Sequence, residues 1–512
     1  MKKYIAALVG LLVCGMSFAQ GEIDAGKMAS RDLMGSARGQ AMGGAFGALG
    51  GDITGIMINP AGLAIYRSAE LSITADLNHT SIKADWNGIS NKDSKTSFDV
   101  SNLSYVFYIP IEEVGIENIN FGFSYNCAKN FNTNISARGG DMATSLTDYI
   151  ADATSGYSSG QLLHDGNRYN AYLDGNASWL SILGYNVGII DETAPGSTNY
   201  EPTGLGVGQM VKPRMDMTER GKVDTYDFSG GINFGHNLYL GAAVSLMDID
   251  YTMRSTYSES FGGNTYYIDN YLNSTGYGVQ VKVGAIWRPI DILRLGVSYH
   301  TPTYYSMTDY YQAWGEANYG PGAYDETPYA DYRYDFQSPY GWTFSGALVL
   351  GKDAIISADW DIKDYSSMKL EERDGRELSA NKWIEEDYRM ASTVRLGAEY
   401  RFLPQLSGRI GYAWMQNPYA ADIREGNVGA VVVGTVPHYM LEGDANYYTI
   451  GLGYRLSSQF YIDLAYVHKS QTDKLYAFPM LYDQNGDLFL DSKAAKLKNN
   501  TSRALITLGY KF

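Results

Sequence analysis

The stretch Thr393-Val-Arg-Leu-Gly-Ala-Glu-Tyr-Arg-Phe402 alternates apolar and polar residues at every second position. Because successive side chains of an extended strand point to opposite faces, its apolar set lies on one face and its charged set on the other. The stretches 354–363 and 71–78 repeat the pattern. One face then suits lipid and the other suits water, as in a strand of a membrane barrel. A two-sheet sandwich alternates in the same way, so the connections must separate the two folds.

The connections alternate in length. The segments that we predict as strands are 70–83, 98–110, 119–133, 223–235, 238–255, 276–288, 292–309, 332–351, 354–365, 392–402, 406–417, 446–456, 459–470 and 502–512. Short turns at 235–237, 288–291, 351–353, 403–405 and 457–458 alternate with long polar segments near 84–97, 134–222, 256–275, 310–331, 366–391, 418–445 and 471–501. This alternation predicts an all-β fold, a transmembrane antiparallel β-barrel of about 14 strands whose long loops face outward.

The composition agrees with a barrel. The 512 residues include 57 Gly and 44 Tyr but only 14 Pro. After the first 20 residues, no segment approaches the ~20 apolar residues of a membrane helix. Tyrosine is typical of the two interfaces of a membrane barrel. The formal charge of −16 argues against a nucleic-acid partner, since phosphate binding needs clustered Lys and Arg.

The first 19 residues have the features of a secretory signal peptide. Met1-Lys2-Lys3 is basic, Ile5 to Met16 is apolar, and small residues end the segment at Ala19. A lipidated Cys14 is the alternative reading, but Val13 is an unusual residue before such a cysteine. Removal of the signal leaves Cys127 as the only cysteine, so no intramolecular disulfide can form.

The last strand, Arg503 to Phe512, alternates in the same way and ends in phenylalanine. Such a terminal strand is the usual mark of a chain that the outer-membrane barrel assembly machinery inserts. A soluble protein that happens to end on a strand is the alternative.

A glycine-rich segment precedes the first strand. It runs from Gly35 to Asp52, with glycines at 35, 39, 43 and 47, and leads into Asn59-Pro60-Ala61-Gly62-Leu63. It is no P-loop, because no Gly-Lys-Ser/Thr ends it, and Arg38 and Gln40 argue against a membrane dimer helix. We therefore predict that residues 20–68 form a compact plug, or hatch, inside a barrel of residues 69–512. The hatch residues that we single out are Gly43, Gly44, Phe46, Leu49, Asn59, Pro60 and Ala61.

Asn59-Pro60-Ala61 is interpreted as a rigid turn that seats the hatch. Proline fixes its own φ and pushes the preceding residue towards extended geometry, and the Asn59 side chain can bond nearby backbone. The alternative is an ordinary turn leading into the first strand.

In these motifs the chain resembles the FadL/TodX family of outer-membrane transporters for long-chain fatty acids and aromatic hydrocarbons. The glycine-rich stretch with Asn59-Pro60-Ala61 is similar to that family's hatch. The further matching stretches are 294–302, 355–360, 395–400, 409–412, 448–454 and 461–466, in the family's order. The resemblance implies a fourteen-stranded barrel, a hatch in the lumen, hydrophobic ligands in apolar pockets and lateral escape through a strand defect. Residues 134–222 depart from it, because they are richer in Ser, Gly and Asn than a helical, apolar ligand-collecting loop.

Several charged residues fall on the inward faces of predicted strands. They are Asp359, Asp361, Lys363, Arg395, Glu399, Arg401, Arg409 and Asp463. An inward arginine can bind a ligand carboxylate by paired charged hydrogen bonds, and Arg395 and Arg409 are our candidates because they lie on neighbouring strands. A network that only neutralises charge in a wet lumen is the alternative.

No motif indicates an enzyme, a metal site or a cofactor. Residues 483–494 resemble a calcium loop, but Leu488 and Ala494 replace its glycine and glutamate, so a plain turn is favoured. The six histidines include no pair at metal-ligand spacing, which gives haem capture little support. No nucleophile motif marks an outer-membrane lipase.

We therefore expect transport of a hydrophobic, fatty-acid-like molecule by a monomer in the outer membrane of a Gram-negative-type cell, surrounded by lipid. A general porin, or a structural or adhesive barrel, is the other function class. An open porin needs no glycine-rich segment ahead of its first strand, and this segment favours the transporter.

Overall fold

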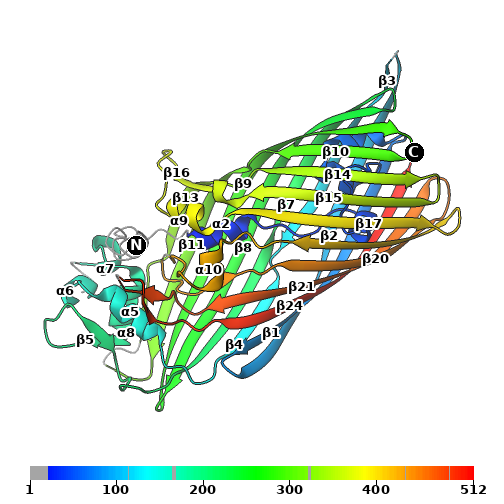
Figure 1. Cartoon of the computed structure of the whole chain (residues 1–512). Helices are drawn as coiled ribbons and strands as arrows, with labels where there is room; N and C mark the ends of the chain where they lie inside the picture. The colour runs from blue at the N-terminus through cyan, green and yellow to red at the C-terminus, as the bar shows by residue number, and fades with distance from the viewer. Residues whose placement is uncertain (1–20, 114, 164–168, 321–323, 433, 484) are drawn as a thin grey trace.

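The computed structural model describes residues 21–113, 115–163, 169–320, 324–432, 434–483 and 485–512, so the signal peptide assigned to residues 1–19 lies outside the described residues. Fourteen strands form one closed antiparallel ring, because β1 pairs with both β2 and β24 (Figure 1). In ring order they are β1 (Glu70–Trp86), β2 (Ile89–Glu113), β3 (Ile116–Asn130), β7 (Lys212–Phe234), β8 (Leu238–Phe261), β9 (Asn264–Ile290), β10 (Leu293–His300), β14 (Gly341–Leu350), β15 (Ala354–Asp364), β17 (Met390–Arg401), β18 (Leu406–Met415), β20 (Ala445–Arg455), β21 (Phe460–Tyr476) and β24 (Ala495–Lys511). The predicted barrel and its strand number are confirmed.

The two faces of the wall differ as the alternation requires. On β9, Val279, Val281 and Val283 are exposed on the outside, whereas Gln280 and Lys282 between them are buried in the lumen. An apolar band outside and polar groups inside are what a lipid-embedded barrel needs. No helix among the described residues is long and apolar enough to cross a membrane.

Three neighbouring strands are interrupted. We predicted 292–309 and 332–351 as continuous, and this was wrong: β11 (Tyr304–Ala317) follows β10 after a break at 301–303, and β13 (Ala330–Gln337) precedes β14 before a break at 338–340. Each break contains a proline, Pro302 or Pro339, which cannot donate to the ladder. On the next strand, η2 (Tyr365–Ser367) separates β15 from β16 (Lys369–Glu372).

The short turns lie at one end of the barrel, here called the turn end, and the long connections at the other, the loop end (Figure 1). Two predicted loops, 84–97 and 256–275, are instead continuations of the strands. Their hairpins close at Asn87-Gly88 and Gly262-Gly263, where all four residues have positive φ. Two-residue hairpin turns need that geometry, and Asn-Gly and Gly-Gly are the pairs that adopt it.

The segment 134–222, which we expected to differ from a helical loop, contains four helices beside the ends of the strands (Figure 1). After β4 (Thr133–Arg138) come α5 (Leu146–Thr154), α6 (Ser159–Leu162), α7 (Ala171–Asp174), α8 (Trp179–Val187), β5 (Ile190–Glu192) and β6 (Tyr200–Pro202). Ser145 and Ser178 cap α5 and α8, and Ile150 and Leu183 are fully buried. Side-chain caps and a few apolar residues therefore fold a segment whose composition is polar.

The other elements of the loop end are short. They are β12 (Tyr324–Glu326), α9 (Ala380–Asp387), α10 (Ala421–Glu425), β19 (Tyr439–Leu441), β22 (Leu481–Tyr482) and β23 (Leu488–Leu490).

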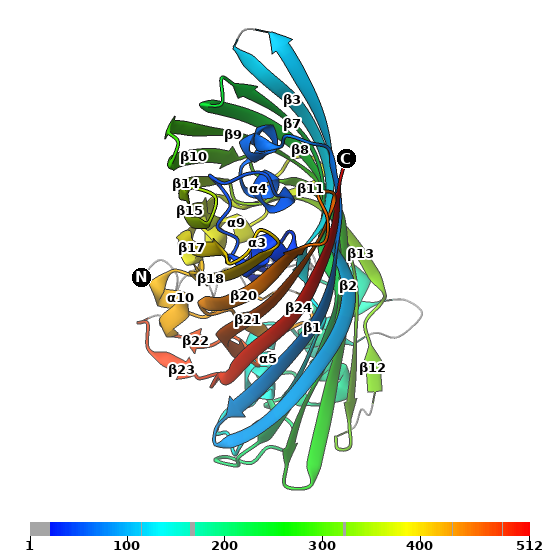
Figure 2. The same cartoon turned by 90° about the vertical axis from the view of Figure 1, so that its right-hand side faces the viewer.

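The N-terminal segment lies inside the ring (Figure 2). It contains α2 (Glu22–Ala29), α3 (Ala37–Ala41), α4 (Ile53–Ile58) and η1 (Pro60–Ile65). α3 packs against β18, β20, β21 and β24, and η1 packs against β3, β7, β8 and β9. The four-residue glycine spacing does not extend one helix, because Gly43 and Gly44 have positive φ and end the helical part.

Candidate functional site

Asn59 ties the N-terminal segment to the wall. Its side-chain nitrogen donates to the carbonyl oxygens of Gly47 at 2.8 Å and Ala285 at 3.1 Å, and more weakly to that of Val297 at 3.4 Å. Its side-chain oxygen accepts from the backbone N–H of Ala61 at 3.1 Å and so caps η1. Extended φ at Asn59 and proline at the next position set this geometry locally.

The wall has a row of glycines where η1 approaches it. Gly241 pairs with Gly231 on one side and with Gly284 on the other, so three neighbouring strands lack side chains at one level. A methyl group on Gly241 or Gly284 would overlap Pro60 or Asn59. The close approach of the N-terminal segment therefore depends on these glycines.

The glycine-rich part is held by polar groups of the lumen. The backbone N–H groups of Phe46 and Gly47 both donate to Asp359, each at 3.0 Å, and that of Gly43 donates to Thr449 at 3.1 Å. Phe46 and Leu49 are buried, and the carbonyl of Leu49 accepts from Arg294 at 2.5 Å.

A charged network lies beside α3. Arg38 forms two hydrogen bonds to Glu399, at 2.9 and 3.0 Å, and Arg409 donates to Glu399 at 2.6 Å and also to Asp463. All four groups are mostly buried. Arg409, one of the two predicted ligand contacts, is thus enclosed by carboxylates and does not line the cavity described next.

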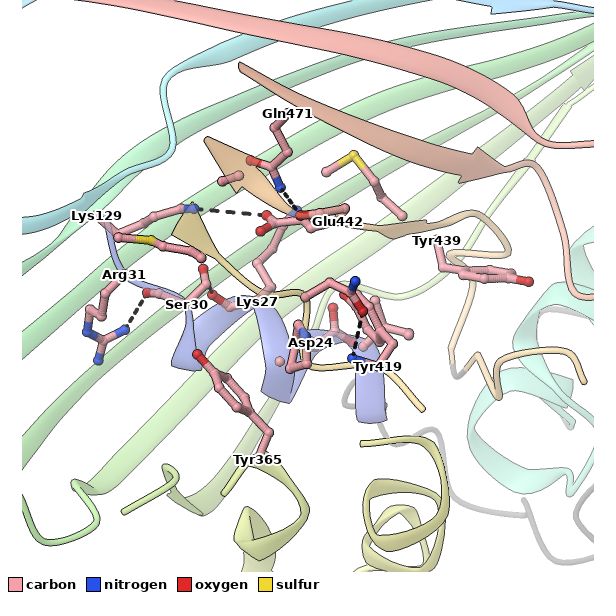
Figure 3. Close-up of a pocket in the computed structure, with 18 of the residues that line it drawn as sticks. Asp24, Lys27, Ser30, Arg31, Lys129, Tyr365, Tyr419, Tyr439, Glu442 and Gln471 are labelled. Atoms are coloured by element: carbon pink, nitrogen blue, oxygen red, sulfur yellow. Dashed lines mark hydrogen bonds and ion pairs between the residues drawn. The ribbon is translucent and has the colours of Figure 1, made fainter. Parts of the chain in front are cut away.

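A cavity of about 200 Å³ lies between α2 and the connections of the loop end. Figure 3 shows α2 crossing it, with Lys129, Glu442 and Gln471 on one side and Tyr365 on the other. The apolar part of its wall includes Ile23, Met34, Met217, Met253, Leu272, Met415, Val431, Val432, Val436, Met440 and Leu475. Flexible methionine and branched aliphatic side chains suit an apolar ligand of adaptable shape.

Ion pairs fix the N-terminal segment beside this cavity. Lys27 pairs with Glu219 and donates to the Tyr251 hydroxyl at 2.9 Å. Asp32 accepts from Lys469 at 3.0 Å and lies 3.8 Å from Lys129. Although burial favours the neutral acid, these two ammonium groups hold the pKa of Asp32 well below its usual range. The segment is therefore anchored as a charged unit.

Two cations of the cavity wall have no carboxylate partner in the described part of the chain. Arg31 donates to the carbonyls of Met28 and Ser30, both at 2.7 Å, and to the Tyr305 hydroxyl at 2.8 Å. Lys363 has no hydrogen bond or ion pair there: the carboxylate of Asp361 bonds Arg395 and attracts Lys363 only from a longer distance. Both residues are half-buried, and a cation that is removed further from water is costly unless an anion accompanies it, so these groups can receive one.

Arg395, the other predicted contact, does line the cavity. It forms an ion pair with Asp361, while its Nη1 atom has no hydrogen-bond partner among the described residues. From the sequence we named Lys363 only as an inward charge and did not single out Arg31, which follows α2. Its position just ahead of the glycine-rich stretch was the available signal, but no spacing in the sequence places it in the same cavity wall as Lys363.

The model of one protein family, described as outer membrane protein transport protein (OMPP1/FadL/TodX), matches residues 215–488, which is more than half of the chain. The chain belongs to this family. The FadL/TodX family consists of outer-membrane transport proteins and not enzymes, so the predicted resemblance and the outer-membrane location are confirmed. Membership also favours the transporter over the structural or adhesive barrel.

Solved structures of the FadL/TodX family share the fold. A FadL homologue of Pseudomonas aeruginosa is 13% identical with a TM-score of 0.53, and the toluene transporter TodX of Pseudomonas putida is 15% identical with a TM-score of 0.51. In both comparisons the match covers 94% of this chain and 99% of the other. A comparison with curated proteins found no significant match.

Proposed function

We propose that this FadL/TodX family protein carries long-chain fatty acids, or similar anionic amphiphiles, across the outer membrane through the cavity beside α2. The observation that carries the proposal is the pairing of an apolar wall with Arg31 and Lys363, two cations without a carboxylate partner in the described chain. An amphiphile with one carboxylate would fill the apolar part and neutralise the cations.

The same pairing favours a fatty acid over a neutral hydrocarbon. A hydrocarbon would displace water from Arg31 and Lys363 without supplying an anion, and an unpaired buried charge costs several kcal/mol, on the order of 3–5. A carboxylate would instead form charge-assisted hydrogen bonds to them. Arg395, with its unpartnered Nη1 atom, is a further donor for the same group.

We also propose that residues 20–68 act as the hatch of a barrel formed by residues 69–512. The support is the set of contacts that Gly43, Gly44, Phe46, Leu49 and Asn59-Pro60-Ala61 make with the lumen wall. Movement of α2, which borders the cavity, would join ligand binding to opening of the hatch. We propose that the loop end of the barrel faces the outside of the cell and receives the ligand.

We propose that the ligand leaves the barrel sideways, through the wall at the interrupted strands β10–β11, β13–β14 and β15–β16. Tyr365, in the third break, lines the cavity, and the first two breaks each carry a proline that leaves the ladder incomplete. A wall with fewer backbone hydrogen bonds opens at lower cost than its neighbours.

The test is a comparison of two ligands that differ only in the head group. Purified protein should bind oleate about tenfold or more tightly than oleyl alcohol, as one charge-assisted bond of ~1.5 kcal/mol requires. Lys363→Met should reduce the difference by weakening the binding of oleate and not that of oleyl alcohol, while Arg31 and Arg395 retain part of the preference. Equal affinities in the parent protein, or tighter binding of toluene than of oleate, would reject the anionic amphiphile.

A further inference from the structure

A cluster of aromatic side chains covers the outer face of the sheet at the loop end, away from the cavity. The guanidinium of Arg254 lies 4.7 Å from the ring centre of Tyr271, and the rings of Tyr310 and Tyr329 stack with centres 6.0 Å apart. Tyr310 pairs with Asn273, two residues from Tyr271 on the same face of β9, and Tyr329 stacks on Tyr310, so the three rings form one group. We call these four residues the aromatic platform.

The platform lies on neighbouring extended strands and faces outward. Arg254 on β8 is directly opposite Tyr271 on β9, and Asn273 on β9 is opposite Tyr310 on β11. Arg254 and Tyr329 are exposed, and Tyr271 and Tyr310 are half-exposed. Exposed rings that stack on each other and on a guanidinium present a flat, pre-organised surface.

The platform continues the lipid-facing band of the same strand. Outward residues of β9 are apolar from Val283 to Val279, then Tyr277 is 76% exposed, and beyond it Thr275 and Asn273 are polar. Tyr277 therefore marks the edge of the band, as aromatic residues do at a membrane interface. A lipid of the leaflet beside this band therefore reaches the platform if its head group is long enough.

The distance between Tyr277 and the platform determines which lipid head group can reach the platform. Tyr271 lies six residues beyond Tyr277, or roughly 20 Å along the strand, which a tilt of about 45° reduces to ~14 Å of height. The head-group zone of a phospholipid leaflet is only about 6 Å thick. A phospholipid therefore does not reach the platform, whereas a chain of several sugars does.

We propose that the aromatic platform binds the oligosaccharide head group of a glycolipid in the outer leaflet. The C–H faces of sugar rings pack on electron-rich aromatic faces, and the neighbouring Asn273, Thr308 and Gln312 supply polar groups for sugar hydroxyls. A protein partner would need an apolar centre, which these polar neighbours do not offer. Only the outward orientation of the loop end is taken from the proposed function.

The test uses the full-length protein in phosphatidylcholine nanodiscs. The probe is the delipidated core oligosaccharide of a rough-type lipopolysaccharide, and the measurement is its dissociation constant. Tyr271→Thr combined with Tyr310→Thr should weaken binding by about tenfold or more, because two stacking surfaces are lost. Threonine suits an exposed strand, so the wall should remain folded.

The matched control is Tyr324→Thr, which changes an exposed tyrosine of β12 that lies outside the platform and bonds Glu326 at 2.7 Å. It should bind the oligosaccharide as the parent does. Equal binding by all three proteins, or equal loss in the control, would overturn the proposal. Oleate binding should stay unchanged in the double variant, which separates a failure of the platform from a failure of the proposed transport function.

Discussion

An ordinary turn forms hydrogen bonds only with backbone nearby in the sequence. The Asn59 amide also donates to carbonyls of β9 and β10, in addition to that of Gly47. Asn59→Ala should leave the barrel assembled but loosen the hatch by ~1–3 kcal/mol, the cost of losing these hydrogen bonds. Leakage of small polar antibiotics should rise and uptake of labelled oleate should fall.

The control for Asn59 is Asn485→Ala, which removes an exposed asparagine of the loop end. Its leakage and uptake should equal those of the parent. If Asn59→Ala reached the membrane in normal amounts with unchanged leakage and uptake, the turn would be an ordinary lead into β1.

His438 makes the loop end sensitive to acid. It lines the cavity, and burial lowers its pKa to about 4; repulsion from Lys27 adds to this effect, while Glu219 opposes it. Because the unfolded segment binds a proton near pH 6.5 and the folded one only near pH 4, stability is full above pH 6.5 and falls as the pH drops from 6.5 to 4. Hydrogen exchange of residues 434–443 should accelerate over this range in the parent and stay flat in His438→Gln. The same acceleration in both proteins would assign the effect to another group.

At the scale of elements, the strands inside the membrane band could be predicted well and those beyond it could not. The predicted strands 354–365 and 392–402 match β15 and β17 within two residues, because lipid on one face enforces strict alternation. Beyond the band the outward face is polar, while the inward face mixes apolar residues such as Ile268 and Leu272 with polar ones, so alternation weakens and the β8–β9 hairpin was taken for a loop. Its Gly262-Gly263 pair was the signal that we missed.

The breaks in the wall provide a prediction at this scale. Thr303 and Ser338 face each other across two breaks, with the Ser338 N–H donating to the Thr303 carbonyl at 3.0 Å. A disulfide between Thr303→Cys and Ser338→Cys, in a Cys127→Ser background, should lock the proposed exit and stop oleate uptake until it is reduced. Uptake is measured before and after addition of dithiothreitol.

The matched pair for this lock is Ser72→Cys with Ser104→Cys, since these residues also face each other in the lumen but lie in the uninterrupted strands β1 and β2. Its oxidation should leave uptake unchanged. Full uptake with the Thr303–Ser338 lock closed would place the exit elsewhere.

At the scale of the whole molecule, the barrel and the presence of a segment ahead of its first strand could be predicted from the sequence, but the cavity could not. The cavity forms where α2 meets side chains from distant strands, such as Lys363 on β15 and Lys469 on β21, and no spacing in the sequence reports that contact. The inward position of Arg395 and Arg409 could be predicted from alternation. Their partners, Asp361 for one and Glu399 and Asp463 for the other, follow from strand register, which alternation does not fix.

The orientation of the barrel has a direct test. The loop end should face outward, so protease added to intact cells should cut at exposed positions such as Leu173 and Val207 and spare the turn at 403–405. Protease that is given access to the periplasmic side of the outer membrane should cut only at the short turns. The reverse cleavage pattern would invert the proposed route.

The cavity between α2 and the loop end should hold an anionic amphiphile. A crystal structure of the protein with oleate would show directly whether it does. We expect an acyl chain against Met253, Leu272 and Val432, with the carboxylate within about 4 Å of Lys363 or Arg31. Oleate bound only on the lipid-facing wall, or bound in the cavity with its carboxylate away from both cations, would contradict it.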